Sequence, residues 1–572
     1  SVGGNSVNGT GGDAEPVVTE VTEATTTTAS ETTVTTTKAP DETTVSQTTE
    51  KPSVTADAIY CSPDGNGDGS SVNSPASFED ALTAVKAGGV IYMLEGTYKY
   101  DHQITIAADN SGSAGAYKSL KAYNNADVKI DFSSQSYNMD DVSKNDRGLQ
   151  VNGSYWYIYG IRFYGAADNG MYIAGKNNRI EMCVFEANRD TGLQIGRSGS
   201  SVTEFADWPS DNLILNCTSF NNMDPATGEN ADGFAAKLTC GNGNTFDGCI
   251  SYNNVDDGWD LYAKSATGPI GVVTIRNCIS FRNGQTSEGV FTKNSDGNGF
   301  KLGGGGVGTA HVIENCISFE NKKHGFTDNN NPLFSSATKC TSYSNGMDSG
   351  ANFQFDRCTS GTFKDLLSFD NQSNTSDKFN GNIDHSVFYN SKKYYLVTAP
   401  TAIANGKTDN VDKGPSADDF ENTDVPALGA DVHKLWRNAD GSINVHGFLQ
   451  VKDSSDYKDM GAKFDGSSSV EPVVTEPIVT VTEPVTETSE TVSATASEST
   501  NSGLPAYTLL GDATLDNDVD VRDVTLVNQY VVKMADMSEQ AIANADVIKD
   551  NTVDLKDLGQ LKKYLIKVIT EF

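Results

Sequence analysis

Four aspartates and one lysine occur at a spacing that could build a metal site beside a base. Asp232 lies in the segment ADGF, Asp256, Asp257 and Asp260 lie in VDDGWD, and Lys301 lies in GNGFK. Carboxylates that converge with no basic partner in their own repeat repel one another strongly, and a hard divalent cation relieves that repulsion. Calcium prefers such cages of oxygen ligands. We therefore expect the four aspartates to hold one calcium ion, provided that the fold gathers them on one face.

Lys301 is the candidate general base next to that ion. A bound cation disfavours a second positive charge nearby, so the pKa of the lysine should fall. A lysine that is neutral in this way can abstract a proton from a substrate. Arg189, Lys237 and Lys264 lie on or beside the same segments, and they are candidates for binding the carboxylate groups of an acidic substrate.

The elements that must position these residues are copies of one repeated motif. The copies NCTSFNN, GCISYNN, NCISFRN, NCISFEN and KCTSYSN alternate apolar and polar residues, which is typical of strands. Because the motif is constant and its spacing is not, loops of different length should join a fixed strand. Many short strands that stack in this way form a β-solenoid. The sequence therefore predicts an all-β domain over residues 57–466, a right-handed parallel β-helix.

Stacking of the copies predicts columns of equivalent residues about 4.8 Å apart. We expect the cysteines of the motif, and also its Phe or Tyr residues, to form columns that face the core. The Asn that ends each copy should stand at a turn, where it tolerates a left-handed backbone, and should form a ladder. A Gly and an inward-facing apolar residue follow each turn, so the next residue should face outward. This outward column contains Gln194, Ala235, Asp260, Lys301 and Thr327.

The flanks of the solenoid differ from it in composition. A helix from about Ser77 to Lys86 should cap the N-terminal end of the stack and block edge-to-edge pairing. Residues 1–56 and 467–507 are rich in Thr, Glu, Val and Ser and show no apolar periodicity, so we expect extended tethers there. A second folded region, small and α-helical, should span residues 508–572.

Residues 508–572 contain two copies of an EF-hand-type calcium loop, each of which leads into a helix. The expected ligands of the first loop are Asp512, Thr514, Asp516, Asp518, Asp520 and Asp523, with Asp518 contributing its backbone carbonyl. Those of the second loop are Asp546, Asp550, Thr552, Asp554 and Asp557, with Thr552 contributing its backbone carbonyl. Ile548 stands where a side-chain oxygen is usual, so the second site should be weaker.

The order of the motifs ADGF, VDDGWD and DGNGFKLGG resembles the family-nine polysaccharide lyases, the β-helical pectate lyases. The resemblance covers residues 57–466. It implies one catalytic calcium ion held by the four aspartates named above, with Lys301 as the base. The implied reaction is β-elimination on a galacturonan: calcium engages the uronate carboxylate and acidifies the C5 proton, the lysine removes that proton, and the bond to the C4 oxygen breaks.

An Asp at the twelfth loop position and the lack of an entering helix make residues 508–572 resemble a type I-like dockerin. The resemblance implies two bound calcium ions and, as the partner, a cohesin domain of a scaffoldin. Val521, Arg522, Leu555 and Lys556 occupy the positions that recognise the cohesin in that family. A calcium-stabilised module without a partner is the alternative.

Composition and charge narrow the remaining classes of function. The chain has 42 Lys and Arg against 76 Asp and Glu, a net charge of −34, which disfavours binding to nucleic acid and to anionic membranes. No apolar run is long enough to span a membrane. The start at Ser1 and the composition of the tethers are typical of a processed, secreted extracellular protein, and we expect a monomer apart from the scaffold complex.

Two other functions stay open on the sequence alone. One is a lyase or an inverting hydrolase that acts on another uronan with the same scaffold. A hydrolase would need a carboxylic acid that stays protonated, and metal-bound aspartates are poor acids. The other is a non-catalytic, polysaccharide-binding β-helix.

Overall fold

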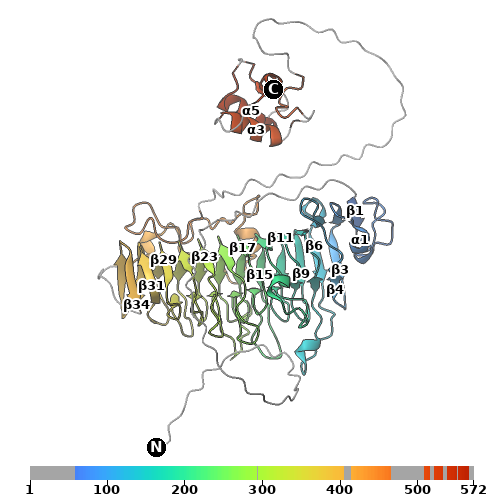
Figure 1. The fold of residues 1–572 in the computed structure, drawn as a ribbon. Coiled ribbons are helices and arrows are strands. Elements are labelled where there is room, and N and C mark those ends of the chain that lie inside the picture. Colours follow the sequence, from blue (N-terminus) through green and yellow to red (C-terminus); the bar gives the residue numbers. More distant parts are fainter. Residues whose placement is uncertain are drawn as a thin grey trace, which may run out of the picture. The chain divides into compact units, whose positions relative to one another are not determined.

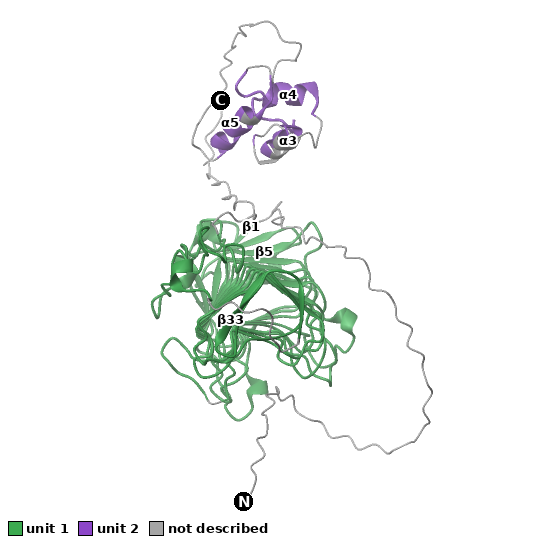
Figure 2. Ribbon diagram, turned by 90° about the vertical axis from the view of Figure 1, so that its left-hand side faces the viewer, with its two compact units in different colours: residues 1–475 green, residues 476–572 purple. Residues whose placement is uncertain are grey.

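The structure is a computed structural model of the chain, and it describes residues 58–292, 294–404, 414–464, 508–515, 519, 521–531, 537–549 and 552–565. The chain divides into two compact units, residues 1–475 and 476–572 (Figure 2). The predicted tethers, residues 1–56 and 467–507, lie outside the described residues. Within the part that is described, none of the helices has both the length and the apolar character that crossing a bilayer requires.

Three rows of short strands wind along the first unit (Figure 1). Row A contains β1 (Ala58–Cys61), β2 (Val90–Met93), β5 (Lys118–Ala122), β8 (Trp156–Tyr159), β11 (Arg179–Glu181), β14 (Leu213–Leu215), β17 (Asn244–Asp247), β20 (Val273–Arg276), β23 (Val312–Glu314), β26 (Ser336–Thr338), β29 (Gly361–Lys364), β31 (Lys378–Asp384) and β34 (Thr401–Ala404). Row B contains β3 (Gly96–Lys99), β6 (Val128–Asp131), β9 (Ile161–Tyr164), β12 (Val184–Glu186), β15 (Thr218–Phe220), β18 (Ile250–Tyr252), β21 (Ile279–Phe281), β24 (Ile317–Phe319), β27 (Thr341–Tyr343), β30 (Leu367–Phe369), β32 (Ser386–Asn390) and β33 (Lys393–Val397). Row C contains β4 (Ile104–Ile106), β7 (Leu149–Val151), β10 (Met171–Ile173), β13 (Leu193–Ile195), β16 (Phe234–Ala236), β19 (Trp259–Asp260), β22 (Phe300–Lys301), β25 (Phe326–Thr327) and β28 (Phe353–Phe355).

Successive coils pair in parallel within each row, which confirms the predicted parallel β-helix. The strand β31 pairs with both β28 and β29, so rows A and C merge at the C-terminal end of the stack. Two antiparallel pairs, β31 with β34 and β32 with β33, complete that end. At the other end, α1 (Phe78–Ala84) is the predicted capping helix, slightly shorter than expected. The N–H of Asp80 donates to the hydroxyl of Ser77 (3.1 Å), which caps the helix N-terminus.

The predicted cysteine column and asparagine ladder are both present. The six motif cysteines are fully buried, and all are free thiols: Cys183, Cys217, Cys249, Cys278, Cys316 and Cys340. The ladder is continuous, because each Asn Nδ2 donates to the Oδ1 of the next at 2.7–3.0 Å through Asn188, Asn222, Asn254, Asn283, Asn321 and Asn345. The expected left-handed backbone falls on the residue before each ladder Asn, for example on Asn221 (φ 58°) and Arg282 (φ 52°), and not on the ladder Asn itself.

The expected inward column of Phe and Tyr residues was wrong. Phe220, Tyr252, Phe281 and Phe319 do stack, with ring centroids 4.5–4.8 Å apart, but they belong to a second apolar cluster outside the central core. Residues from the C-terminal stretch 420–464 cover them, with Trp436 among these residues. Alternation along row B is the cause, since the serine before each aromatic residue faces the interior instead and donates to a glycine carbonyl, as in Ser251, Ser280 and Ser318.

Short helical elements complete the first unit. They are η1 (Tyr123–Asn125), η2 (Val142–Lys144), η3 (Phe205–Asp207), η4 (Ala417–Asp419) and α2 (Val432–Leu435). The second unit contains α3 (Val521–Val531), α4 (Glu539–Ala545) and α5 (Leu555–Leu565). Its core consists of Ala513, Val527, Ala545, Val547, Leu558 and Leu561. The expected lack of an entering helix was wrong for the second loop, because α4 ends directly before Asp546.

Candidate active site

Strands β16, β19 and β22 carry the predicted residues on neighbouring coils of row C. Phe234 pairs with Trp259, and Trp259 pairs with Phe300, with ring centroids 5.0 and 4.7 Å apart in the core. The same register places Asp260 directly beside Lys301 on the other side of the strands. The outward column that the sequence predicted is therefore confirmed as a column of paired residues.

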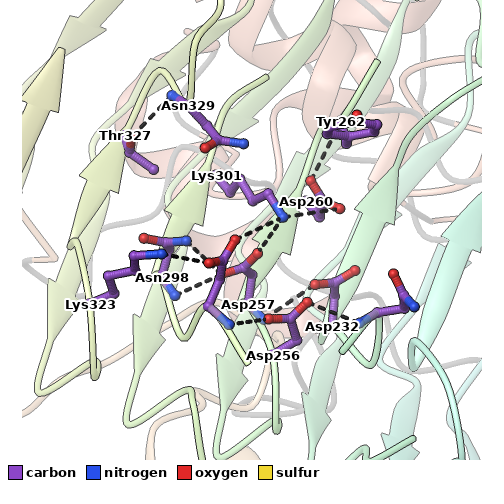
Figure 3. Close-up of polar contacts among 12 residues, drawn as sticks. Asp232, Asp256, Asp257, Asp260, Tyr262, Asn298, Lys301, Lys323, Thr327 and Asn329 are labelled. Carbon is purple, nitrogen blue, oxygen red and sulfur yellow. Dashed lines mark hydrogen bonds and ion pairs between the residues drawn. The ribbon is translucent and has the colours of Figure 1, made fainter. Parts of the chain in front are cut away.

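The turns that precede these strands supply the other aspartates (Figure 3). Asp232, Asp256 and Asp257 are buried, and each offers a carboxylate oxygen within 4.8 Å of the others. The backbone N–H and side-chain amide of Asn298 donate to Oδ1 of Asp257 at 2.7 and 2.8 Å, and the N–H of Asp257 donates to Oδ1 of Asp232 at 3.2 Å. Donors of the neighbouring coil thus fix the carboxylates in place.

Two lysines connect Asp260 to this cluster. The Nζ of Lys301 lies 3.0 Å from Oδ2 of Asp257 and 3.7 Å from Oδ2 of Asp260. The Nζ of Lys237 lies 3.0 Å from Oδ2 of Asp232 and 3.5 Å from Oδ2 of Asp260. The expectation that the carboxylates have no basic partner in their own coil was therefore wrong. The side chain of Lys237 is only 2% exposed, and its ammonium group pairs with Asp232 and Asp260, so its predicted contact with a substrate stays a prediction.

Burial makes the negative charges of this cluster costly. It raises the pKa of Asp256 to about 7 and that of Asp257 to about 6, and it raises the pKa of Asp232 well above its ordinary value. Burial also opposes the charge of Lys301, but the neighbouring carboxylates, Asp257 first, raise the pKa of this lysine well above its ordinary value. With the charges of the protein alone Lys301 is an ammonium group, so the lower pKa expected from the sequence depends on a bound cation.

The donor set suits a hard divalent cation. It consists of carboxylate oxygens, three of which converge from two coils in a buried position. The Oδ2 of Asp257 is buried and accepts no hydrogen bond within the described ranges, and its contact is the ion pair with Lys301. A cation at this place would favour the ionised form of all these acids. The residues present therefore fit calcium.

Asp296 belongs to the site, and the sequence did not reveal it. Its Oδ2 lies 3.5 Å from Nζ of Lys301, its Oδ1 lies 2.5 Å from Nζ of Lys323, and its N–H donates to Oδ1 of Asp256 at 2.7 Å. Although burial opposes its charge, the two lysines lower the pKa of Asp296 to about 2. The residue stands in the loop GQTSEGVFTKNSDGNGF, which has no apolar periodicity, so the only signal was an acid close before the lysine.

Arg189 and Lys264 are the other basic residues expected to bind substrate. The guanidinium of Arg189 lies 5.4 Å from the ring centroid of Tyr137. Lys264 stands in a turn, where its carbonyl accepts the N–H of Gly268 at 2.9 Å. Their roles toward a substrate stay predictions.

The two loops of the second unit have equivalent contacts at their ends. The N–H of Thr514 donates to Oδ1 of Asp523 at 2.8 Å, and the N–H of Ile548 donates to Oδ1 of Asp557 at 3.0 Å. The four acids that begin and end the loops are buried: Asp512, Asp523, Asp546 and Asp557. Of the other predicted ligands, Asp516, Asp518, Asp520 and Asp550 lie outside the described residues.

The predicted cohesin-binding positions lie at the start of two helices. Val521 and Arg522 begin α3, and Leu555 and Lys556 begin α5, so the two pairs are equivalent in the two repeats. Lys556 is exposed, and its Nζ lies 3.5 Å from Oδ2 of Asp554.

Comparison with known families gives two matches. The family described as "Pel9A-like, right handed beta helix region" matches residues 59–380, so the right-handed form of the predicted β-helix is confirmed. The family described as "Dockerin type I domain" matches residues 510–566.

Individual proteins agree with these matches. "Pectate lyase L" of Paenibacillus polymyxa (strain SC2) is 44% identical over 412 residues, which are 71% of this chain and 83% of the relative. "Pectate lyase L" of Dickeya dadantii (strain 3937) is 31% identical over 413 residues, which are 71% of this chain and 86% of the relative. The crystal structure of pectate lyase Pel9A has a TM-score of 0.55 and 29% identity, and the similarity covers 72% of this chain and 93% of that one.

Proposed function

Because the chain belongs to the family of Pel9A-like right-handed β-helix proteins, the family-nine polysaccharide lyases, we propose that it cleaves the galacturonan of pectin by calcium-assisted β-elimination, with Lys301 as the base. The observation that carries this proposal is the position of Lys301. Lys301 stands on the strand beside Asp260, and its Nζ lies 3.0 Å from Oδ2 of Asp257.

The residues proposed to hold the calcium ion are Asp232, Asp256, Asp257 and Asp260. The bound ion would supply the positive charge that neutralises a uronate carboxylate and acidifies the neighbouring C5 proton. Asn298 keeps Asp257 in place through two hydrogen bonds, and Lys237 does the same for Asp232 through its ammonium group. Preorganised groups of this kind need little rearrangement during the reaction.

Lys301 would then remove the C5 proton with its neutral amine. The electron pair of the C5–H bond becomes the double bond between C4 and C5. The bond from C4 to the glycosidic oxygen breaks, and that oxygen takes a proton from solvent. One product carries a new reducing end, and the other carries an unsaturated ring that absorbs ultraviolet light.

The second unit is a dockerin, and its proposed role is assembly into a multi-enzyme complex. We propose two calcium ions in its loops and a cohesin domain as its partner, contacted through Val521, Arg522, Leu555 and Lys556. Secretion follows from the proposed polymeric substrate and scaffold, both of which lie outside cells. The proposed state in the absence of the scaffold is a monomer.

The test is an ultraviolet assay on polygalacturonate at alkaline pH, in parallel with added calcium and with a chelator. The expected result is an absorbing product with calcium and none with the chelator. Reducing ends without absorbance would mean hydrolysis and would remove Lys301 from its role. If neither polygalacturonate nor any other uronan gave a product, the protein would be a non-catalytic, polysaccharide-binding β-helix. Calorimetry with purified cohesin domains tests the dockerin separately, and no binding to any of them would contradict the assembly role.

A further inference from the structure

An arginine in the loop before β7 contacts the outward column that contains Lys301, toward the N-terminal end of the stack. The Nη1 of Arg147 donates to Oε1 of Gln150 at 2.7 Å. Gln150 stands on β7 and pairs in register with Tyr172 on β10. From Tyr172, three further register steps through β13 and β16 lead to Asp260 on β19. The arginine and the candidate active site therefore share one face of row C.

The arginine is held by its surroundings in a fixed orientation. Its guanidinium carbon lies 3.5 Å from the ring centroid of Tyr172, a stacked contact. The ring is itself fixed, because it is buried and its hydroxyl donates to the carbonyl of Arg197 at 3.1 Å. The side chain of Arg147 stays 27% exposed, so a ligand can reach the guanidinium group from solvent. Because this group is already held in one orientation, binding of a ligand would cost little side-chain entropy.

The neighbouring acid, Asp168, does not accept a hydrogen bond from Arg147. The Nε of Arg147 lies 3.6 Å from Oδ2 of Asp168, which is an ion pair but too long for a hydrogen bond. A guanidinium has five N–H donors in a planar fork, and such a fork matches a carboxylate in a bidentate manner. Among the described residues, the contacts with Gln150 and Asp168 leave donors of Arg147 available to a further anion.

The position along the column fits a long acidic polymer. Three steps of about 4.8 Å place Tyr172 roughly 14 Å from Asp260. A fourth step leads to Lys301. One hexuronate unit of a 1,4-linked chain advances by a distance similar to one coil, so a chain that follows the column would bring a uronate carboxylate to Arg147 about three to four sugars from the cleaved bond. Since the protein carries a net charge of −34, an acidic polymer needs local cations such as this one.

We propose that Arg147, held on Tyr172, is a distal subsite that binds the carboxylate of a uronate unit of the substrate. The proposal rests on the proposed function and on the polymer lying along row C. It gives the enzyme a preference for long chains, because only a chain that spans several coils reaches both Arg147 and Lys301.

The experiment compares Arg147→Met with Lys144→Met, which removes an equally positive side chain that is 69% exposed in the same loop. Initial rates are measured with polygalacturonate and with trigalacturonate. For Arg147→Met we expect KM for the polymer to rise about tenfold, which is the loss of one charged hydrogen-bonded contact, while kcat changes less than about twofold. With trigalacturonate both constants should stay unchanged, and Arg147→Lys should recover part of the polymer KM because it keeps the charge without the planar fork.

The outcomes separate this inference from the proposed function. Wild-type protein that is inactive on every uronan would overturn the function, whereas active wild-type protein with the same polymer KM in Arg147→Met would overturn the subsite alone. An equal rise in KM for trigalacturonate would also overturn it, because the effect would then act at the reacting centre. If Arg147→Met shows a lower melting temperature, Arg147→Gln is measured in its place, and calorimetric binding of long oligogalacturonates to Lys301→Ala with and without the change gives the affinity without turnover.

Discussion

The carboxylates of the solenoid and those of the dockerin are assembled in different ways. In the solenoid, Asp232, Asp257 and Lys301 come from three coils and meet only because β16, β19 and β22 pair in register. In the dockerin, the acids of each site lie within one loop of the sequence, and Asp523 closes its loop by accepting the N–H of Thr514. Strand pairing places the acids of the solenoid together once the stack has folded. In the dockerin we expect each loop to need its calcium ion to hold its acids together.

The groups that hold the acids in place also differ in their position along the chain. Lys237 and Lys301 lie against the acids of the solenoid, so part of the repulsion is already relieved by the protein. In the dockerin, N–H and hydroxyl groups of the loops themselves donate to Asp523 and Asp557, so these acids are held within their own loops. Removal of calcium should therefore affect activity in the first unit and folding in the second.

The largest expected effect comes from Lys301→Ala. Loss of a general base typically costs 10²- to 10⁴-fold, so we expect kcat on polygalacturonate to fall about 10³-fold. The matched control is Lys378→Ala, because Lys378 stands on the same column three steps further, through Thr327 and Gln354. The control should stay within about threefold of wild type. A Lys301→Ala variant that retains its melting temperature and more than a tenth of its activity would remove the lysine from the role of base.

The second effect is the response to a chelator, and the two units can be observed separately. All four tryptophans, Trp156, Trp208, Trp259 and Trp436, lie in the solenoid, so tryptophan fluorescence reports on that unit alone. Removal of calcium held a thousandfold above its dissociation constant costs about 4 kcal/mol per site. We expect the chelator to abolish the helical circular dichroism contributed by α3 and α5, while the fluorescence melting temperature shifts by only a few degrees. The reverse pattern would contradict the comparison between the two units.

The third effect concerns the protonation of a buried histidine, and it belongs to the solenoid because residues 508–572 contain no histidine. His311 is buried, its Nδ1 accepts the N–H of Val273 at 3.1 Å, and burial lowers its pKa to about 3. The folded state therefore resists protonation, so stability is fully present above pH 6.5 and is lost as the pH falls from 6.5 toward 3. At pH 5 the loss is about 2 kcal/mol.

Urea unfolding followed by tryptophan fluorescence at pH 7 and pH 5 measures this loss. His311→Asn keeps an acceptor for Val273 but does not titrate, so its stability should fall less on acidification, by about 2 kcal/mol. The control is His102→Asn, because His102 is half-exposed, and the side chains of Asp101 and Glu79 raise its pKa. Equal acid sensitivity of His311→Asn and wild type would show that His311 is protonated without cost in the folded state.

The positions of site residues on strands could be predicted from the sequence better than the positions of site residues in loops. The alternation after each glycine was sufficient to place Asp260 beside Lys301, because strand register repeats from coil to coil. The same alternation would have turned Phe281 outward, but its apolar character suggested the core, and only the structure shows Trp436 covering it. Asp296 and Arg147 stand in loops without periodicity, so their contacts depend on where the loops fold back.

The smallest expected effect is that of Asp296→Asn, which is compared with Asp257→Asn because both acids contact Lys301. Asp257 is buried and bonded to the neighbouring coil, so Asp257→Asn should reduce kcat/KM about 10²-fold through loss of a charge that is desolvated and paired. Asp296 is 37% exposed, and exposed ion pairs contribute about 0.2–1 kcal/mol, so Asp296→Asn should reduce kcat/KM less than about fivefold. Asp348→Asn, at an acid that is 69% exposed and pairs with Lys322, should leave the rate unchanged. An equal loss of kcat/KM in Asp296→Asn and Asp257→Asn would contradict this expectation. The loop residue would then hold Lys301 as firmly as the acid that strand pairing places beside it.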